Sequence, residues 1–494
     1  MEKKIVYYSE YGAVGDGVTD DHAALLAAHT DANENGYEVH ADEGATYYIP
    51  PHTVTIPIKT NTVWTGANFI IDDREINYNR HPAQYTHLFT VLPSLERFDM
   101  ELGEIKQGAK SIGKAPGVNC LVHIECDTIK HYIRYGGNAN NGSAQTEILL
   151  VHADGTIDES TPVIWDYPTV TKCFAIPTDE EPVTLNGGDF LTLANEINCD
   201  NWYCTQRNIA VRRSNTVIKN VKHSLKQVKD YRSAYGGIFN TAYCNNVLIK
   251  DCVVQCHKGM YFDKPRADGT MQKILIGSYE LHADHCNKIV YDGVYQTNLF
   301  DENGKLISQG LMGTNYCRNM VMQNCTVARF DAHCQVHNLL IKNCVMEHIN
   351  TIGFGKVTVL DTEIWDHYIF NLRSDYGSTF CGDYELKNIK MMNTDKQRLS
   401  LFLGSWVNHD FGYTVHYPQN VTIENMSAPE GAVMGAYTTN FDSYEDITKP
   451  VLEDGTPNSN PVVVTKSLKV LSNPAGTTFV DYEGKIPFPK FEYV

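Results

Sequence analysis

A short unit recurs through the second half of the chain and limits the folds that this chain can adopt. Two neighbouring copies, NMVMQNC from residue 319 and NLLIKNC from residue 338, lie 19 residues apart. Further copies begin at residues 215, 246, 288, 356, 383 and 420. A minimum spacing near 18 residues with variable additions is the signature of a solenoid whose loops absorb the insertions. The runs are short, β-branched and flanked by Asn, Asp and Gly, so the units are predicted to be strands and turns.

Cysteine and asparagine keep fixed places in this repeat. Six cysteines fall at two unit positions, six residues after the start or two residues before it: Cys252, Cys325 and Cys344, and Cys244, Cys286 and Cys317. Equivalent positions of parallel strands stack about 4.8 Å apart, so we expect buried columns of free thiols. Zinc is the less favoured alternative, because no CxxC pair occurs. The Asn after each strand is expected to turn the corner and bond the neighbouring rungs.

Composition excludes several classes of partner. The net charge of −18 over 494 residues argues against nucleic acid and anionic membranes. It argues more weakly against a highly anionic polysaccharide, because a local basic groove can override it. No run of 18 apolar residues and no apolar leader segment occur, so no membrane partner is expected. The 14 cysteines then indicate reduced thiols in a cytoplasmic protein, or an exported one if a signal peptide has been removed.

The N-terminal region carries a second pattern. YGAVGDGVTDD at residues 11–21 precedes an alanine- and leucine-rich stretch, which predicts a helix over 20–28 with Thr19-Asp20-Asp21 at its start. This segment resembles the opening of the pectate-lyase-like right-handed parallel β-helix superfamily. The resemblance implies an all-β solenoid over residues 1–430, closed at its N-terminal end by the helix. Residues 74–200 are expected to be early rungs with long loops, and residues 431–494 strands that cap or flank the solenoid.

Polar side chains precede several unit starts and suggest a site along one edge. We predict Asp331, Asp284 and His333 as catalytic residues. The predicted substrate-binding residues are His282, Asn315, Arg232, Arg373 and Asp375. Glycoside hydrolysis needs one carboxylic acid to protonate the leaving oxygen and a second carboxylate to activate water or attack carbon. Asp284 and Asp331 are expected two rungs apart, about 10 Å between backbones, which favours inversion; His333 would orient Asp331 or raise its pKa. The structural alternative is that each residue only anchors a turn.

The predicted function is therefore hydrolysis of glycosidic bonds in an oligo- or polysaccharide, with no metal and no cofactor. The first alternative is a lyase acting on a uronate-containing glycan, with Arg232, Arg329 or Arg373 as base or carboxylate clamp and with Ca²⁺ as a candidate cofactor. The second is a tailspike-like glycan-binding protein without catalysis, which would form a trimer. A homo-oligomer is thus compatible with the sequence.

Overall fold

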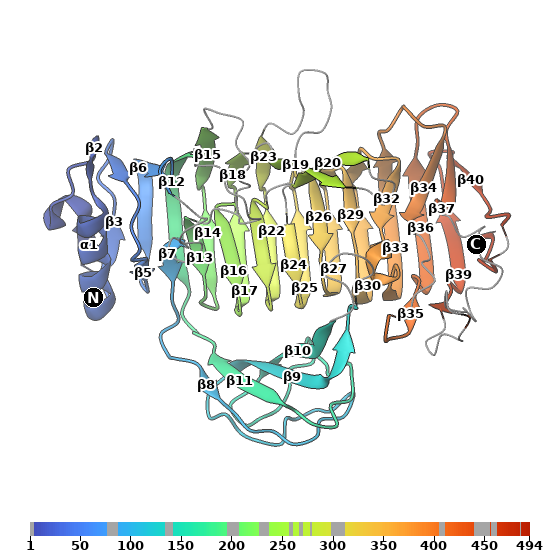
Figure 1. The fold of residues 1–494 in the computed structure, drawn as a ribbon, viewed down its shortest axis with the longest axis horizontal. Coiled ribbons are helices and arrows are strands. Elements are labelled where there is room, and N and C mark those ends of the chain that lie inside the picture. The colour runs from blue at the N-terminus through green and yellow to red at the C-terminus, as the bar shows by residue number, and fades with distance from the viewer. Residues whose placement is uncertain are drawn as a thin grey trace.

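The computed structural model describes residues 4–76, 87–133, 142–194, 207–226, 237–255, 260–265, 270–276, 279–297, 312–404, 411–438, 455, 462–484 and 486–494. Over these residues the strands wind into two long parallel sheets, here called sheet A and sheet B, which enclose one hydrophobic core. Figure 1 shows the strands stacked along the long axis, with the two termini at opposite ends. The predicted all-β parallel β-helix is confirmed. In the described part, no helix is long and apolar enough to cross a membrane.

Sheet A carries the repeated units, and each rung of the repeat bends at its Asn, Asp or Gly. In chain order its strands are β1 (Ile5–Tyr7), β2 (Asp16–Asp20), β3 (Glu38–His40), β4 (Thr46–Ile49), β6 (Thr62–Asp72), β12 (Val183–Leu193), β14 (Thr216–Lys219), β15 (Lys222–Lys226), β17 (Asn245–Lys250), β18 (Val253–Gln255), β22 (Asn287–Asp292), β23 (Tyr295–Thr297), β25 (Cys317–Gln323), β27 (Val336–Lys342), β28 (Val345–Met346), β30 (Gly353–Leu360), β31 (Glu363–Ile364), β33 (Phe380–Met391), β36 (Asn420–Ser427), β39 (Ser467–Ser472) and β41 (Phe491–Tyr493).

Sheet B holds the predicted site. Its hydrogen-bonded order is β5 (Ile56–Ile58), β7 (His87–Val91), β13 (Asn208–Val211), β16 (Phe239–Ala242), β21 (Leu281–Asp284), β24 (Met312–Asn315), β26 (Arg329–Ala332), β29 (His348–Asn350), β32 (Tyr368–Asn371), β34 (Arg398–Leu403), β37 (Val433–Thr438) and β40 (Thr478–Val480). In β26, Phe330 and Ala332 belong to the core, so Arg329 and Asp331 face outward. Strands β37, β39, β40 and β41 extend both sheets beyond residue 430.

The asparagine ladder is confirmed. Asn338 donates its amide to Asn319 at 3.0 Å, and Asn319 donates to Asn287 at 2.9 Å. A second ladder runs from Asn343 through Asn324 to Asp292, at 2.8 and 2.7 Å. Several of these Asn have positive φ, for example Asn324 at 56°, a backbone region that Asn tolerates better than most residues.

The cysteine positions are buried as predicted, with one change in the column. Cys252, Cys325 and Cys344 are free thiols with at most 1% exposure. Val294 takes the equivalent place in the rung between Cys252 and Cys325, so the thiols are not one uninterrupted stack. Cys244 and Cys286, from the other column, have their sulfur atoms 3.7 Å apart. The column that holds Cys252, Val294 and Cys325 therefore requires a small apolar side chain, and both Cys and Val supply one.

Helix α1 (His22–Asn35) covers the N-terminal end of the solenoid in Figure 1. It extends seven residues past the predicted end at residue 28, to Asn35, and is capped by Gly36, whose φ is 72°. Leu25, Ala28 and Ala32 bury its inner face. Asp21 does not cap the helix with its side chain; instead its carboxylate accepts the backbone N–H of Val14 at 2.6 Å. The helix thus closes the otherwise open end of the core, as expected for a solenoid cap.

A small antiparallel sheet is inserted between β7 and β12 and hangs below the solenoid in Figure 1. Its strands β8 (Phe98–Asp99), β9 (Cys120–His131), β10 (Ser143–Val151) and β11 (Lys172–Pro177) surround their own hydrophobic cluster. A fully buried Arg318–Glu147 ion pair ties this inserted subdomain to the solenoid. The region predicted as early rungs with long loops therefore contains two true rung segments, β7 and β12, and this separate sheet between them.

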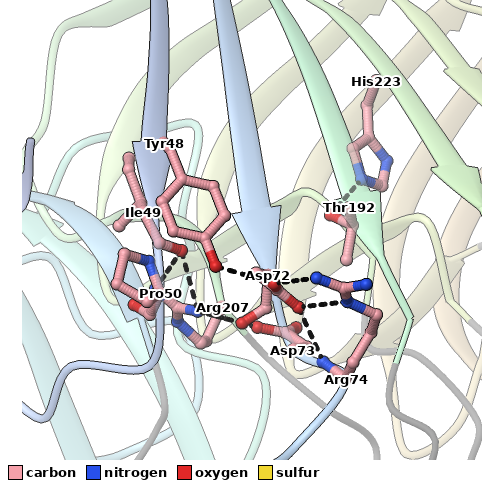
Figure 2. Close-up of polar contacts among 9 residues, drawn as sticks. All are labelled: Tyr48, Ile49, Pro50, Asp72, Asp73, Arg74, Thr192, Arg207 and His223. Atoms are coloured by element: carbon pink, nitrogen blue, oxygen red, sulfur yellow. Dashed lines mark hydrogen bonds and ion pairs between the residues drawn. The ribbon is translucent and has the colours of Figure 1, made fainter. Parts of the chain in front are cut away.

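Two edges join the sheets. We call the connections from sheet A to sheet B, at 50–55, 73–86, 194–207, 227–238, 256–280, 298–311, 327–328, 347, 365–367, 392–397 and 428–432, the A-to-B edge. This edge is long near the N-terminus and shortens to one residue at Glu347. Figure 2 shows its N-terminal part, where Arg207 pairs with Asp73 at 2.8 Å, both side chains being at most 2% exposed. Arg207 also donates to the carbonyl of Pro50, and Tyr48 to Asp72, so this cluster holds successive rungs together.

Two further strand pairs lie outside the main sheets. The hairpin of β19 (Met260–Pro265) and β20 (Met271–Ile276) stands at the upper side of the molecule in Figure 1. Strands β35 (Val415–His416) and β38 (Val462–Val463) pair near the C-terminal end, on the side of the inserted subdomain.

Candidate functional site

Two rows of polar side chains cross the outer face of sheet B. In the first row the strand register aligns Asn240, His282, Gly313, Asp331, Asn350 and Asn371 on successive strands. In the second row it aligns Asp284 with Asn315, and His333 follows β26 in the same line. The sequence-predicted residues His282, Asp284, Asn315, Asp331 and His333 therefore do share one face. Arg232 lies outside the described residues.

The register differs from the predicted one in one respect. Asp331 is level with His282, whereas Asp284 is level with Asn315, two residues further along the strand. Two strand spacings and two residues place the Asp284 and Asp331 backbones about 12 Å apart. The pair is therefore diagonal and wider than the 10 Å that sequence alignment suggested.

Asp331 is a buried anion, and both oxygens of its carboxylate accept hydrogen bonds. Its side chain is 2% exposed, and it accepts hydrogen bonds from Arg329 at 3.0 Å and from Asn350 at 2.9 Å. His333 Nε2 lies 3.1 Å away and Arg373 Nη1 3.5 Å away. Burial raises the pKa of Asp331, but the His333 hydrogen bond and the three nearby cations outweigh burial and hold that pKa well below its usual range. The expectation that His333 raises this pKa is wrong.

Arg373 and Asp375 join the same cluster. Arg373 makes a two-pronged ion pair with Asp375, at 3.0 and 2.9 Å, and its guanidinium lies 5.1 Å from the centre of the Tyr376 ring. Arg373 has a positive φ of 54° at the start of a 3₁₀ turn, Ser374–Tyr376, which aims its side chain back at Asp331. The two predicted substrate-binding residues are thus already paired with each other.

Asp284 is more accessible than Asp331. Its side chain is 26% exposed and lies 3.1 Å from His285 Nδ1. Burial raises its pKa, but His285, His282 and Asn315 together lower the pKa of Asp284 below its ordinary value. Burial lowers the pKa of the neighbouring His282, which keeps that imidazole neutral near pH 7. Asp284 and Asp331 are therefore both ionised, and neither holds the proton that a general acid must donate.

A second carboxyl pair, missed in the sequence, stands at the shortest part of the A-to-B edge. Glu347 and Asp366 occupy adjacent rungs, and the backbone N–H of Asp366 donates to the carbonyl of Glu347 at 3.0 Å. Ligand atoms of Glu347, His348 and Asp366 all lie within 4.8 Å of one another. The Glu347 and Asp366 side chains are 26% and 16% exposed, so both are open to solvent in part.

The environments of these two carboxyls push their pKa values apart. Burial raises the pKa of Glu347, and the charge of Asp366 adds to this rise. Burial also acts on Asp366, but His348 and His367 outweigh it and lower the pKa of Asp366. His348 Nδ1 lies 3.1 Å from Asp366, and His367 Nδ1 lies 2.6 Å from it. One carboxyl thus keeps its proton longer than usual while its neighbour is ionised, the arrangement found for acid and base partners.

The exposure and the ligand number of the Glu347–Asp366 pair differ from those of a structural ion pair and of a calcium site. Asp73 and Arg207 on the same edge are paired with each other (Figure 2) and buried, whereas Glu347 and Asp366 are partly exposed to solvent. Ca²⁺ takes six to eight oxygen ligands. Glu347, His348 and Asp366 supply three ligand atoms, one of them nitrogen, so the group fits proton transfer better than calcium.

The sequence contains a signal for this pair. Glu347-His348 and Asp366-His367 are carboxylate–imidazole dipeptides 19 residues apart, the same spacing as the adjacent units that begin at 319 and 338. The residues just before each unit start lie at the other edge of sheet B, so a pattern based on those starts does not include Glu347 or Asp366. Arg329, named as a lyase residue, lies between the clusters: it binds Asp331 and pairs in register with His348.

Comparison with known proteins identifies the fold. No family model and no curated protein sequence matches this chain. Among solved structures, the tailspike gp49 of Pseudomonas phage LKA1 is similar with a TM-score of 0.53 at 12% identity, covering 99% of this chain and 83% of that one. The Gp54 tailspike of Acinetobacter baumannii bacteriophage AP22, solved in complex with a capsular saccharide, gives 0.52 at 11% identity, covering 99% and 76%. The Pseudomonas phage phi297 tailspike gp61 gives 0.52 at 12% identity, covering 99% and 84%. The predicted resemblance is thus confirmed for the fold, and the chain is a right-handed parallel β-helix.

Proposed function

We propose that this protein binds a polysaccharide on the outer face of sheet B and hydrolyses its glycosidic bonds, with Glu347 as proton donor and Asp366 as the second carboxylate. The observation that carries the proposal is the Glu347–Asp366 pair, two partly exposed carboxyls within 4.8 Å whose surroundings shift their pKa values in opposite directions. The AP22 tailspike was solved with a capsular saccharide, which supports a polysaccharide as the class of ligand.

Glu347 is suited to protonate the leaving oxygen. Glycosidic oxygen is a poor leaving group unless a carboxylic acid delivers a proton as the bond breaks. A raised pKa keeps a larger fraction of Glu347 protonated at neutral pH than an ordinary glutamate would show. Glu347 is one residue from β29 and its backbone N–H binds the carbonyl of Ala328 at 2.7 Å, so the acid sits on a rigid rung.

Asp366 is suited to the complementary role. His348 and His367 hold it ionised and fix its orientation from two sides. Carboxyl groups about 5–5.5 Å apart allow direct attack on the sugar carbon with retention, whereas about 6.5–9.5 Å leaves room for a water and gives inversion. A carboxylate oxygen of Glu347 and one of Asp366 lie within 4.8 Å of each other, and this short separation favours retention. This differs from the inversion expected from Asp284 and Asp331.

In this proposal the sequence-predicted residues bind substrate. Asp331 keeps Arg329, His333 and Arg373 in place beside the row of Asn and His side chains, which can bind sugar hydroxyls. Catalysis by Asp331, Asp284 and His333 stays a prediction and is the alternative assignment. The absence of a cofactor, the oligomeric state and the cellular compartment also stay predictions.

A polysaccharide panel with two readouts tests the function. A hydrolase releases reducing ends without ultraviolet absorbance, a lyase releases unsaturated uronides that absorb, and a binding protein releases neither. We expect reducing ends from at least one polysaccharide. On that substrate Glu347→Gln should abolish release, while Glu363→Gln, an exposed carboxyl on β31 that pairs with Lys390, should not. Full activity in Glu347→Gln together with loss in Asp331→Asn and Asp284→Asn would transfer the assignment to the sequence-predicted pair.

A further inference from the structure

A cavity of about 340 Å³ lies where the inserted subdomain meets the solenoid. His131, Tyr132 and Trp165 of the subdomain line one side, and Phe354, Tyr413 and His416 line the other. In Figure 1 the ends of β9 and β10 approach the underside of the solenoid near β30 and β35. Its volume falls in the range of small-molecule sites, about 300–1,000 Å³.

The cavity walls are aromatic. The His131 ring stacks on Trp165 with centroids 4.5 Å apart at 23°, and Phe354 meets Trp165 edge-on at 5.1 Å and 62°. Behind Phe354, His337 stacks on its other side at 4.9 Å. These contacts hold the rings as fixed flat surfaces. Flat apolar faces with a few polar groups suit the apolar C–H face and hydroxyl rim of a sugar ring.

The lining of the cavity is polar in part but uncharged. The backbone N–H of His416 donates to Thr379 Oγ1 at 3.2 Å, so these two lining residues are tied to each other. The residues that line the cavity include no Asp, Glu, Lys or Arg, which argues for an uncharged ligand.

Packed side chains connect the cavity to the polar cluster around Asp331. Tyr132 packs on Tyr376 at 6.2 Å, the Arg373 guanidinium lies over Tyr376 at 5.1 Å, and Arg373 Nη1 is 3.5 Å from Asp331. Glu347 and Gly353, which lines the cavity, belong to one rung and are six residues apart, about 20 Å of extended chain. A polysaccharide that crosses sheet B along this rung would reach both places.

We propose that this cavity is a distal subsite that binds an uncharged sugar unit of the polysaccharide held at Glu347 and Asp366. The proposal rests on the proposed function for its choice of ligand. It assigns a binding role to the inserted subdomain, because His131, Tyr132 and Trp165 complete a wall that the solenoid alone lacks. A polysaccharide that binds the cavity with one sugar unit and is cleaved at the opposite edge would have a fixed distance between the bound unit and the bond that is cleaved.

Affinity electrophoresis in gels containing dextran, galactan, glucomannan, arabinoxylan or polygalacturonate tests this subsite. We expect at least one neutral polysaccharide to retard the wild-type protein. Trp165→Ala should weaken that retardation about tenfold, and Trp165→Phe, which keeps a flat ring, should restore most of it. Tyr295→Ala removes an exposed aromatic ring from sheet A and serves as the matched control. Thermal unfolding of each variant establishes that the subdomain is folded.

The outcomes separate this proposal from the proposed function. Retardation of Trp165→Ala equal to wild type, retardation only by polygalacturonate, or no retardation by any of the five polysaccharides would overturn the subsite. Measurements in the Glu347→Gln background keep the polysaccharide intact. If Trp165→Ala weakens binding while Glu347→Gln retains full hydrolytic activity, the subsite stands and the catalytic assignment falls.

Discussion

Replacement of Glu347 by Gln is the sharpest test of the catalytic assignment. Gln has nearly the same shape but cannot donate a carboxylic proton. Loss of general acid catalysis is expected to lower kcat/KM on a polysaccharide by about 10²–10⁴, equivalent to about 2.7–5.5 kcal/mol of transition-state stabilisation. The expected change in folding stability is small, within about 0.5 kcal/mol, because Glu347 is 26% exposed and is uncharged when protonated.

The pH dependence gives a second measure. Because the folded-state pKa of Glu347 is raised, the folded protein holds this proton to a higher pH than the unfolded chain does. The stabilising contribution is present below the unfolded pKa and is lost as pH rises through the folded pKa. Activity should fall over the same interval as the acid deprotonates. In Glu347→Gln both effects disappear, so its stability should depend less on pH above the usual glutamate range.

Leaving-group dependence separates acid catalysis from a structural defect. An aryl glycoside of the substrate sugar, with nitrophenol as leaving group, needs little protonation. We expect the kcat/KM of Glu347→Gln, which reports formation of the glycosyl-enzyme, to recover most of its value on that compound, and Asp366→Asn to remain inactive on both substrates. Thermal unfolding and polysaccharide hydrolysis measured on the same preparations complete the assay. If Glu347→Gln hydrolyses the polysaccharide within a few-fold of wild type, or is equally impaired on the aryl glycoside, the reasoning from the carboxyl pair is refuted.

Three further results are expected. Proton NMR of the first-formed sugar should show retained anomeric configuration, and inversion would show that the 4.8 Å pair does not carry both roles. Asp331→Asn should destabilise the protein by about 3–5 kcal/mol in urea unfolding, since it removes the carboxylate that Arg329 pairs with, while Arg373 keeps Asp375; activity loss at wild-type stability would instead favour Asp331 as a catalyst. Asn324→Ala should cost about 1–2 kcal/mol in the same assay, because it loses two ladder hydrogen bonds and a tolerated positive φ, and an unchanged midpoint would remove the ladder as a source of stability.

The repeat made the fold predictable because each unit sets its own strand, turn and buried position from a few consecutive residues. Each unit needs a strand, a residue that tolerates positive φ and a small buried group, and Asn324-Cys325 and Asn343-Cys344 supply the last two in consecutive letters. The inserted subdomain has no such repeat; its antiparallel register joins residues such as Cys120 and Val151 that no short pattern links. Sequence spacing also placed Asp284, Asn315 and Asp331 on one face correctly, since register follows from counting residues between units.

The ionisation state of each site residue could not be predicted from the spacing of residues in the sequence. Asp331 and Glu347 stand 16 residues apart, each beside a histidine or arginine, and resemble each other as sequence. Their environments differ because Arg373, 42 residues downstream, folds back through a left-handed residue onto Asp331, whereas Glu347 faces another carboxylate. The His333 hydrogen bond and the charges of His333, Arg329 and Arg373 lower the pKa of Asp331, whereas burial and the charge of Asp366 raise the pKa of Glu347.

The shape of the A-to-B edge explains why acid chemistry would be placed at Glu347 rather than at an earlier rung. Upstream connections of this edge run to 25 residues, at 256–280 with the β19–β20 hairpin, and at its N-terminal part the polar groups of Asp73 and Arg207 hold rungs together. At Glu347 the connection is a single residue, so its position is fixed by the strands on both sides, and its side chain is 26% exposed. A glycan needs an open approach and a catalytic acid needs a rigid support. In this solenoid the shortest rung meets both conditions, and the aromatic cavity on the same rung gives a chain that arrives there a place to be anchored.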